Sequence, residues 1–360
     1  MEGAIVPRQL EGPIRASEYS VVGPRGEEAR ELGLAGADWY RTPVPRKQLK
    51  ELMKRRDWPG VRDTMIWFGL LLLTGGMGVA FLDQPWLAIP LFAVYGVLYA
   101  SAGEARWHEC LHGTPFKNRK LNAILFEISS FLAMRNPVVS RWSHTRHHTD
   151  TYIVGLDPEQ VYHRPPDIAR QIIAFAGLIE FPTSLYDMLR HASGHLSDEE
   201  KVFVPEMERP LVQRTAIVWT LILAGVVIAC FATGSVVPAL LVGLPRIYGV
   251  WLIQALALTQ HAGLLDDVLD HRLDSRTFHM NPVGRFIYWN MNYHIEHHMY
   301  PMVPYYNLPA LHRAIAHDCP PAYPSVLATY REIVPTLLRQ LKDPSYRVVR
   351  PLPAAAQTAA

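Results

Sequence analysis

Long apolar stretches alternate with polar ones along the chain, and four of the apolar stretches are long enough to cross a bilayer. They cover roughly residues 64–82, 86–102, 212–232 and 236–259. A helix needs about 20 apolar residues to cross a bilayer core, so each stretch predicts a transmembrane helix. The pattern therefore predicts an all-α, polytopic membrane protein.

The segments that flank these stretches predict how the helices pair. Residues 83–85 join the first two stretches and residues 233–235 join the last two, and neither connector contains a lysine or an arginine. The run 46–56, just before the first stretch, holds six basic residues. Because basic residues gather on the cytoplasmic side of membrane helices, we expect two hairpins with outward-facing turns and both termini in the cytoplasm.

Two further apolar stretches lie between the hairpins and are not expected to span. Residues 121–133 are too few, and residues 168–189 are interrupted by charged residues and a proline, which favours an interfacial or re-entrant helix. We expect three parts along the chain: a cytosolic, polar N-terminal arm (1–60) that begins loosely ordered, a membrane domain (61–320), and a cytosolic C-terminal helix with a disordered tail (321–360).

Composition narrows the class of protein. Hydrophobic residues make up 49% of the 360 and charged residues 19%, and the formal net charge is +2. So small a charge gives no support for nucleic-acid binding. The three cysteines lie far apart without a Cys-x-x-Cys pair, which argues against a disulfide framework, a rubredoxin-type iron site or an iron–sulfur cluster. Any electrons that the protein uses are therefore expected from another protein.

Histidines gather in three short blocks, and this grouping predicts a metal site. A ninth histidine, His261, ends the fourth apolar stretch. The blocks contribute His108 and His112; His144, His147 and His148; and His294, His297 and His298. Positions i, i+3 and i+4 share one face of a helix, so the imidazoles within each block point the same way. The predicted hairpins place all nine histidines at the cytoplasmic face of the membrane.

The number of imidazoles indicates how many metals are held. Zinc sites take about three or four ligands, so nine neutral imidazoles suit two metals with four or five nitrogens each. Imidazole also binds zinc, copper, iron and nickel, so ligand type alone does not choose the metal. The other histidines are expected to be surface or packing residues, namely His163, His191, His195, His271, His279, His312 and His317.

The motifs HECLHG, SHTRHH and NYHIEHHMYP resemble the three histidine boxes of the membrane fatty acid desaturase and hydroxylase superfamily, and the resemblance covers roughly residues 60–320. It implies a desaturase-like catalytic domain of four transmembrane helices under a cytosolic helical cap. It also implies that the eight box histidines and His261 bind two irons, without haem or flavin. In this family, dioxygen and two electrons oxidise an unactivated C–H bond.

The third box and its surroundings look closer to a bacterial branch that includes rhizopine-catabolism hydroxylases and their Rieske-type ferredoxin partners. This resemblance implies a bacterial cytoplasmic membrane. It also raises the alternative that the substrate is a small polar metabolite, hydroxylated or oxidatively demethylated, rather than a fatty-acyl or other alkyl chain. A third hypothesis, a metal-binding membrane transporter or sensor, would require polar residues inside the spanning helices, and these are sparse.

Several residues beside the boxes have two interpretations. Asn290 is either a water-mediated or indirect partner of the metals or a capping and packing residue, and Asp157 either orients a ligand histidine or forms a turn before Pro158. Five aromatic residues either line a substrate tunnel or anchor the chain at the membrane interface: Trp142, Tyr152, Trp289, Tyr293 and Tyr300.

We expect no fused cytochrome b5-like or ferredoxin domain in these 360 residues. We therefore expect an external electron donor, a ferredoxin, Rieske-type protein or rubredoxin with its reductase. Four basic residues near the boxes are candidates for its docking patch: Lys117, Arg119, Arg141 and Arg146.

Overall fold

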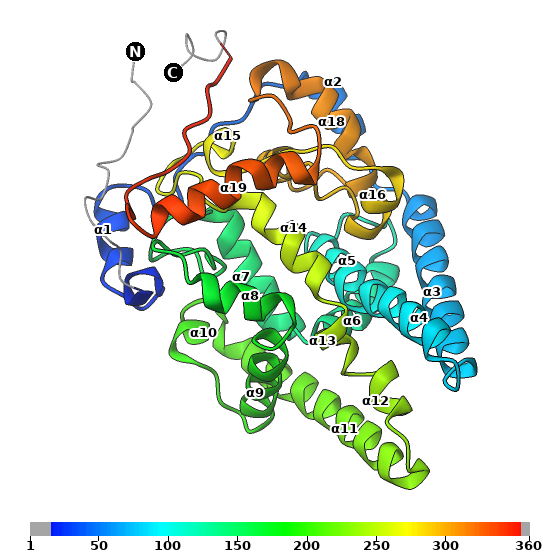
Figure 1. The fold of residues 1–360 in the computed structure, drawn as a ribbon. Coiled ribbons are helices and arrows are strands. Elements are labelled where there is room, and N and C mark those ends of the chain that lie inside the picture. Colours follow the sequence, from blue (N-terminus) through cyan, green and yellow to red (C-terminus); the bar gives the residue numbers. More distant parts are fainter. Residues whose placement is uncertain (1–15, 354–360) are drawn as a thin grey trace.

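A computed structural model describes residues 16–353 of the chain, and these residues form helices and loops without a β-strand (Figure 1). Two isolated bridges, Thr277 with Tyr293 and Phe278 with Tyr323, are the extended pairings within the described part. The elements are η1 (Ala16–Tyr19), α1 (Arg25–Glu31), α2 (Arg46–Leu52), α3 (Asp57–Ala80), α4 (Pro85–Gly96), η2 (Val97–Ala102, π-helical), α5 (Gly103–Leu111), α6 (Arg119–Ala133), α7 (Pro137–Thr149), α8 (Ile168–Phe175), α9 (Glu180–Ala192), α10 (Asp198–Phe203), η3 (Glu206–Glu208), α11 (Arg209–Thr233), α12 (Val237–Leu241), α13 (Pro245–Tyr248), α14 (Trp251–His261), α15 (His271–Asp274), α16 (Pro282–Tyr288), α17 (His294–Met299), η4 (Tyr305–Asn307), α18 (Leu308–Ile315), η5 (Ala316–Asp318) and α19 (Val326–Gln340).

Among residues 16–353, three helices are long and apolar enough to cross a membrane. They cover Arg46–Ala80, Pro85–Leu111 and Glu206–Thr233, and they contain the second and third predicted spans and all but the last two residues of the first. Their outer faces carry exposed apolar side chains, such as Leu72 and Phe231, which suit a lipid environment. In Figure 1, α3, α4 and α11 extend away from the cap that contains α15, α18 and α19. The described chain therefore combines membrane helices with a helical cap.

The fourth predicted span, residues 236–259, is wrong as a single helix. The structure divides it into α12, α13 and α14, because Gly243 adopts a left-handed φ of +94° and Pro245 starts a new helix. Gly249 ends that helix against Gly96, where a side-chain Cβ would meet the Gly96 carbonyl oxygen at 1.9 Å. The apolar composition of residues 236–259 predicted one helix, because hydropathy carries no information on where the backbone bends.

The expected interfacial or re-entrant segment forms the helix pair α8 and α9. The two helices are bent by 84° relative to each other, which is the form of a broken span or a re-entrant loop. With this pair counted as one span, the described chain has up to four candidate spans.

The described part of the N-terminal arm is packed against the rest of the chain, contrary to the expectation of loose order. Trp39 stacks on His271 with ring centroids 4.2 Å apart, and its indole nitrogen donates to the Thr149 carbonyl oxygen at 2.8 Å. Tyr40 and Thr42 both donate hydrogen bonds to the Asp318 carboxylate. The expectation for residues 1–15 lies outside the described residues, as does that for residues 354–360 of the tail.

The cap is built around the third histidine block. Buried apolar residues of α17 and α18, such as Ile295 and Leu311, form one hydrophobic cluster with the connecting segment. Burying such side chains contributes roughly 1.5–3 kcal/mol each, so the short helix α17 is stabilised by packing rather than by its own length. The cap thus holds the third block rigidly over the first two.

Candidate metal centre

Each histidine block lies at a helix terminus or on a short helix. His108 is in the last turn of α5 and His112 follows its end, while the second block occupies the last turns of α7. Helix α7 starts at Pro137, and the Asn136 side chain accepts a hydrogen bond from the Val138 amide, an arrangement that stabilises a helix start. Because helical spacing holds within each block, its imidazoles project together, as the sequence predicts.

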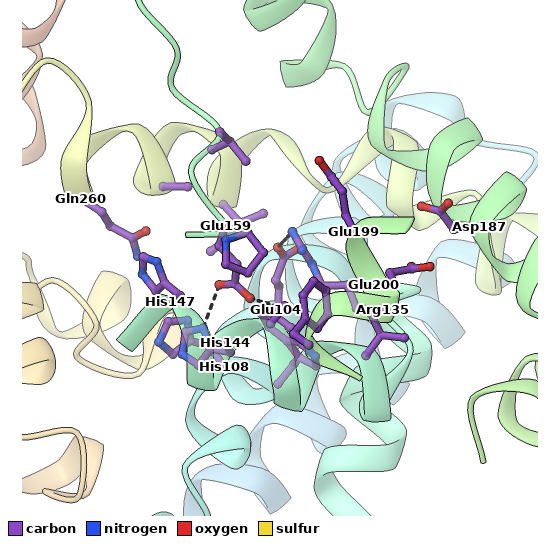
Figure 2. Close-up of a pocket in the computed structure, with 18 of the residues that line it drawn as sticks. Glu104, His108, Arg135, His144, His147, Glu159, Asp187, Glu199, Glu200 and Gln260 are labelled. Carbon is purple, nitrogen blue, oxygen red and sulfur yellow. Dashed lines mark hydrogen bonds and ion pairs between the residues drawn. The ribbon is translucent and has the colours of Figure 1, made fainter. Parts of the chain in front are cut away.

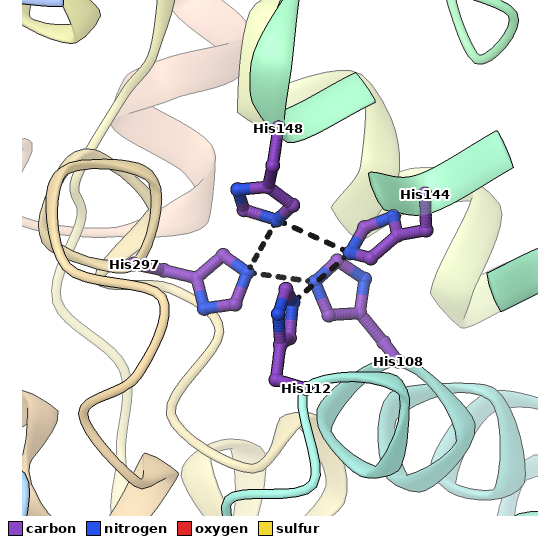
Figure 3. Close-up of side chains that lie close together, drawn as sticks. All are labelled: His108, His112, His144, His148 and His297. Carbon is purple, nitrogen blue, oxygen red and sulfur yellow. Dashed lines mark hydrogen bonds between the residues drawn. The ribbon is translucent and has the colours of Figure 1, made fainter. Parts of the chain in front are cut away.

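Five histidines from all three blocks form a first group, which we call group A (Figure 3). Their ligand nitrogens lie within 4.8 Å of one another. Neighbouring Nε2 atoms are separated by 2.9 Å between His108 and His297, by 3.1 Å between His112 and His144 and by 3.2 Å between His148 and His297. The members of group A are His108, His112, His144, His148 and His297.

The other four predicted ligands form group B. His147, His261 and His298 have ligand nitrogens within 4.8 Å of one another, and the Nε2 atom of His294 lies 2.9 Å from that of His261 and 3.0 Å from that of His298. The two groups adjoin, since the rings of His148 and His298 stack 4.4 Å apart. The structure therefore brings all nine predicted histidines together, in two groups.

The pKa of most of these histidines favours the neutral imidazole, which is the form that binds a metal, and His147 is the exception. Burial, together with repulsion between neighbouring rings, holds the pKa of six box histidines and of His261 well below the usual value: His112, His144, His148, His294, His297, His298 and His261. Burial also acts on His147, but the Asp157 carboxylate outweighs it and raises the pKa of His147 to about 9. Neutral imidazoles whose lone pairs converge cannot all be satisfied by one another, so the donor set fits two metal cations.

The outer ring nitrogens are held by hydrogen bonds that orient the imidazoles. His147 Nδ1 donates to Asp157 Oδ2 at 2.8 Å, and His144 Nδ1 donates to Glu159 Oε2 at 2.8 Å. His261 Nδ1 donates to the Asp274 carbonyl oxygen at 2.8 Å. Such bonds fix the ring tautomer and its direction and raise its basicity toward a metal.

Two carboxylates beside the histidines were missed by the sequence reasoning. Glu159 follows Asp157 by two residues in the same loop, so its position in Asp-Pro-Glu was an available signal. Glu109 lies between His108 and Cys110, and its Oε1 is 3.7 Å from His297 Nδ1. The i, i+4 pattern that selected His108 and His112 concerned histidines alone, so it gave no reason to select Glu109 between them.

Asn290 is placed in a turn ahead of α17. Its φ is +57°, a left-handed conformation that asparagine tolerates better than most residues. Its side-chain nitrogen donates to the Tyr305 carbonyl oxygen at 3.0 Å, which is a packing contact. A water-mediated role at the metals stays a prediction.

A cavity of about 880 Å³ opens beside the histidines. One wall contains five predicted ligands: His108, His144, His147, His261 and His294. The opposite wall, on α9 and α10, carries charged residues, among them Asp187, Arg190 and Glu200, and Figure 2 shows Asp187, Glu199 and Glu200 lying across from the histidines. A substrate could therefore contact the histidine wall and the charged wall together.

Tyr152 is the tunnel candidate that lines this cavity, and its ring stacks on His261 with centroids 4.5 Å apart. The other four aromatic candidates are not part of its described lining. Trp289, for example, is fully buried and stacks on Tyr305, and Tyr300 donates to the Thr42 carbonyl oxygen. For these residues the structure shows packing contacts.

Two of the histidines that were expected to be surface or packing residues are buried, namely His271 and His191. His271 is buried between Trp39 and His298, with its ring centroid 4.9 Å from that of His298. His191 is also buried and is hydrogen bonded to Glu200 at 2.9 Å, on the charged side of the cavity. Both fit packing roles, and neither belongs to the two histidine groups.

Comparison with known proteins identifies the family. Residues 84–330 match the family model described as fatty acid desaturase, and this match covers more than half of the 360 residues. The chain therefore belongs to the fatty acid desaturase family, a family of oxidoreductases whose di-iron chemistry fits the histidine centre.

The chain is similar over 274 residues, at 26% identity, to a chloroplastic omega-3 fatty acid desaturase of Glycine max, covering 69% of this chain and 57% of the relative. It is 26% identical over 275 residues to a chloroplastic sn-2 acyl-lipid omega-3 desaturase (ferredoxin) of Helianthus annuus, covering 69% and 58%. An endoplasmic-reticulum acyl-lipid omega-3 desaturase (cytochrome b5) of Arabidopsis thaliana is 23% identical over 256 residues, covering 64% of each chain. The chain thus spans little more than half the length of the first two relatives.

Proposed function

We propose that the protein is an oxygen-dependent membrane oxidoreductase that holds two irons in groups A and B and oxidises an unactivated C–H bond. The observation that carries the proposal is the convergence of nine imidazoles in two adjoining groups, five of which line a cavity large enough for an organic substrate. Iron suits this centre because the ligands are nitrogens without a thiolate and because the family uses di-iron. We also propose that the centre and both termini lie on the cytoplasmic side, following the basic run 46–56, and that the membrane is bacterial, following the resemblance of the third box to bacterial hydroxylases.

The reaction has one of two outcomes with the same inputs. Desaturation consumes O2, two electrons and two protons, removes two hydrogens from adjacent carbons and releases two waters. Hydroxylation consumes the same inputs, inserts one oxygen atom and releases one water. Bound iron supplies the activation of O2, while the protein orients its ligands through Asp157 and Glu159 and shields them by burial.

A fatty-acyl or other alkyl chain is the leading substrate, and electrons come from an external ferredoxin-type donor. The relatives support this proposal, because their names describe acyl-lipid desaturases that use ferredoxin or cytochrome b5.

One observation favours the alternative of a small polar metabolite. The cavity wall opposite the histidines carries Asp187, Asp198, Glu199 and Glu200, and an alkyl chain placed against charged groups would lose hydrophobic stabilisation of about 0.8 kcal/mol for each CH2 that stays hydrated. A hydroxylated or aminated substrate would instead form hydrogen bonds there.

The test is metal analysis followed by product analysis on the purified full chain. We expect about two irons per chain and oxygen consumption under reduction. Zinc without oxygen consumption would instead support the transporter or sensor hypothesis. Incubation with acyl and polar substrates, followed by mass spectrometry, then distinguishes the loss of two hydrogens from the gain of one oxygen.

A further inference from the structure

Two basic segments that are far apart in the sequence meet beside the start of α3. The Asn118 amide donates to the Asp57 carboxylate at 2.8 Å, which joins residues 54–57 to residues 117–120. Gly60 packs so closely on this second segment that a Cβ there would meet Pro115 and Phe116 at 2.8 Å and 2.6 Å. The contact is therefore tight, and it gathers six basic residues on one surface, which we call the basic patch: Lys54, Arg55, Arg56, Lys117, Arg119 and Lys120.

The charge of this patch is poorly compensated within the protein. Lys54 lies 3.7 Å from Glu51 in an exposed pair, but among the described residues the other five have no carboxylate within ion-pairing distance. Arg119 and Lys120 also occupy the first turn of α6, where no acidic residue is present and where the helix dipole disfavours positive charge. Both the missing carboxylates and the helix dipole disfavour positive charge on this surface. An acidic partner protein would compensate that charge.

The basic patch differs from the docking surface expected from the sequence. Lys117 and Arg119 belong to it, whereas Arg141 and Arg146 lie on α7, where they approach Glu208 at 4.0 Å and Asp150 at 3.0 Å. The charges of these two arginines are already balanced, so they offer less to an acidic protein.

A short series of contacts connects the patch to group A. The Tyr306 hydroxyl accepts a hydrogen bond from the Arg56 amide at 2.7 Å, and its ring lies against the Tyr305 ring with centroids 5.2 Å apart. Burial raises the pKa of the Tyr305 hydroxyl, and the neighbouring Asp63 and Glu109 carboxylates raise it further, while Glu109 Oε1 lies 3.7 Å from His297 Nδ1. The surface and the histidine centre are thus linked by a hydrogen bond, a ring contact and two electrostatic contacts.

We propose that the basic patch is the docking surface for an acidic one-electron carrier protein, and that Tyr306, Tyr305 and Glu109 provide the route by which each electron reaches His297. The proposal rests on the proposed function. In each encounter the carrier is oxidised by one electron and one histidine-held iron is reduced from the ferric to the ferrous state. Two encounters supply the two electrons of a turnover.

The test measures how fast a reduced plant-type [2Fe–2S] ferredoxin reduces the iron-loaded full chain in phosphatidylcholine nanodiscs. The triple variant Arg56→Glu, Lys117→Glu and Arg119→Glu should lower the second-order rate by about tenfold or more at low ionic strength and weaken its dependence on salt. Reduction by dithionite, which needs no docking, should remain unchanged. A matched control, Arg313→Glu, Arg331→Glu and Lys342→Glu, makes the same change in net charge on exposed residues of the cap and its C-terminal end.

An undiminished ferredoxin rate in the patch variant, or an equal loss in the control, would overturn the proposal. A loss that appears only in nanodiscs containing phosphatidylglycerol would assign the patch to lipid phosphates and would overturn it too. Tyr306→Leu should slow reduction at saturating ferredoxin, whereas Tyr306→Phe, which keeps the ring, should not. Failure of the proposed function is seen separately, as wild-type protein without iron or without dithionite-driven oxygen consumption.

Discussion

The two walls of the cavity differ in how their polar groups are held. On the histidine wall, the imidazoles are buried and several have their outer nitrogens fixed by Asp157, Glu159 and a backbone carbonyl. On the opposite wall, Asp187 and Glu199 lie on the surface helices α9 and α10 and are partly or largely open to solvent. We infer that the first wall sets the chemistry and the second sets which molecules enter. Substitutions on the two walls should therefore have separable effects.

Removing a ligand should have the largest effect. We expect His147→Ala and His297→Ala each to abolish turnover and to lower the iron content, because each deletes a nitrogen from one of the two groups. Iron content and oxygen consumption measure the effect, with His317→Ala, an exposed histidine, as the control. Retained activity in both ligand variants would contradict the assignment.

Removing a carboxylate that orients a ligand histidine should have an intermediate effect on iron affinity or activity. Asp157→Ala and Glu159→Ala should reduce iron affinity or activity by about 10–100-fold, since partners of ligand histidines typically contribute that much. Iron retained after dialysis against a chelator gives the affinity. Asp157→Asn, which keeps a hydrogen-bond acceptor beside His147, should retain more iron than Asp157→Ala, and equal losses would argue against an orienting role.

Neutralising the charged wall should have a smaller effect that is confined to the substrate. Asp187→Asn and Glu199→Gln should leave the iron content unchanged and raise KM for a polar substrate by about 3–10-fold, the equivalent of one lost hydrogen bond or so. For an alkyl substrate, KM should stay the same or fall. Steady-state kinetics with both substrate classes therefore shows which class the wall serves, and a fall in iron content would mean that the walls are not independent.

Weakening the contact between the N-terminal arm and His271 should have the smallest effect, which we expect in the rate of iron release. Trp39→Ala removes the ring that stacks on His271, and we expect iron to be lost a few-fold faster on mild heating, while Trp39→Phe should largely preserve iron retention. Time courses of iron release give the comparison. Identical release from wild-type and Trp39→Ala protein would show that the arm does not support group B.

The predictable and unpredictable parts of this fold differ in the range of the interactions that determine them. Helical spacing and the i, i+3, i+4 rule were enough to select the nine histidines, and hydropathy located three of the spans. The break at Gly249 depends on the close approach of Gly96, and the packing of Trp39 depends on His271. Such contacts join residues more than 140 positions apart, and neither periodicity nor composition records them.

The arm also implies an order of assembly. Tyr40 and Thr42 are synthesised early, yet their partner Asp318 lies 278 and 276 positions later. Domains generally fold as the chain emerges from its N-terminus, but this arm must wait until nearly the whole polypeptide exists. The docking of the arm is thus a late event during biogenesis, in which one of the first segments to be made packs against one of the last.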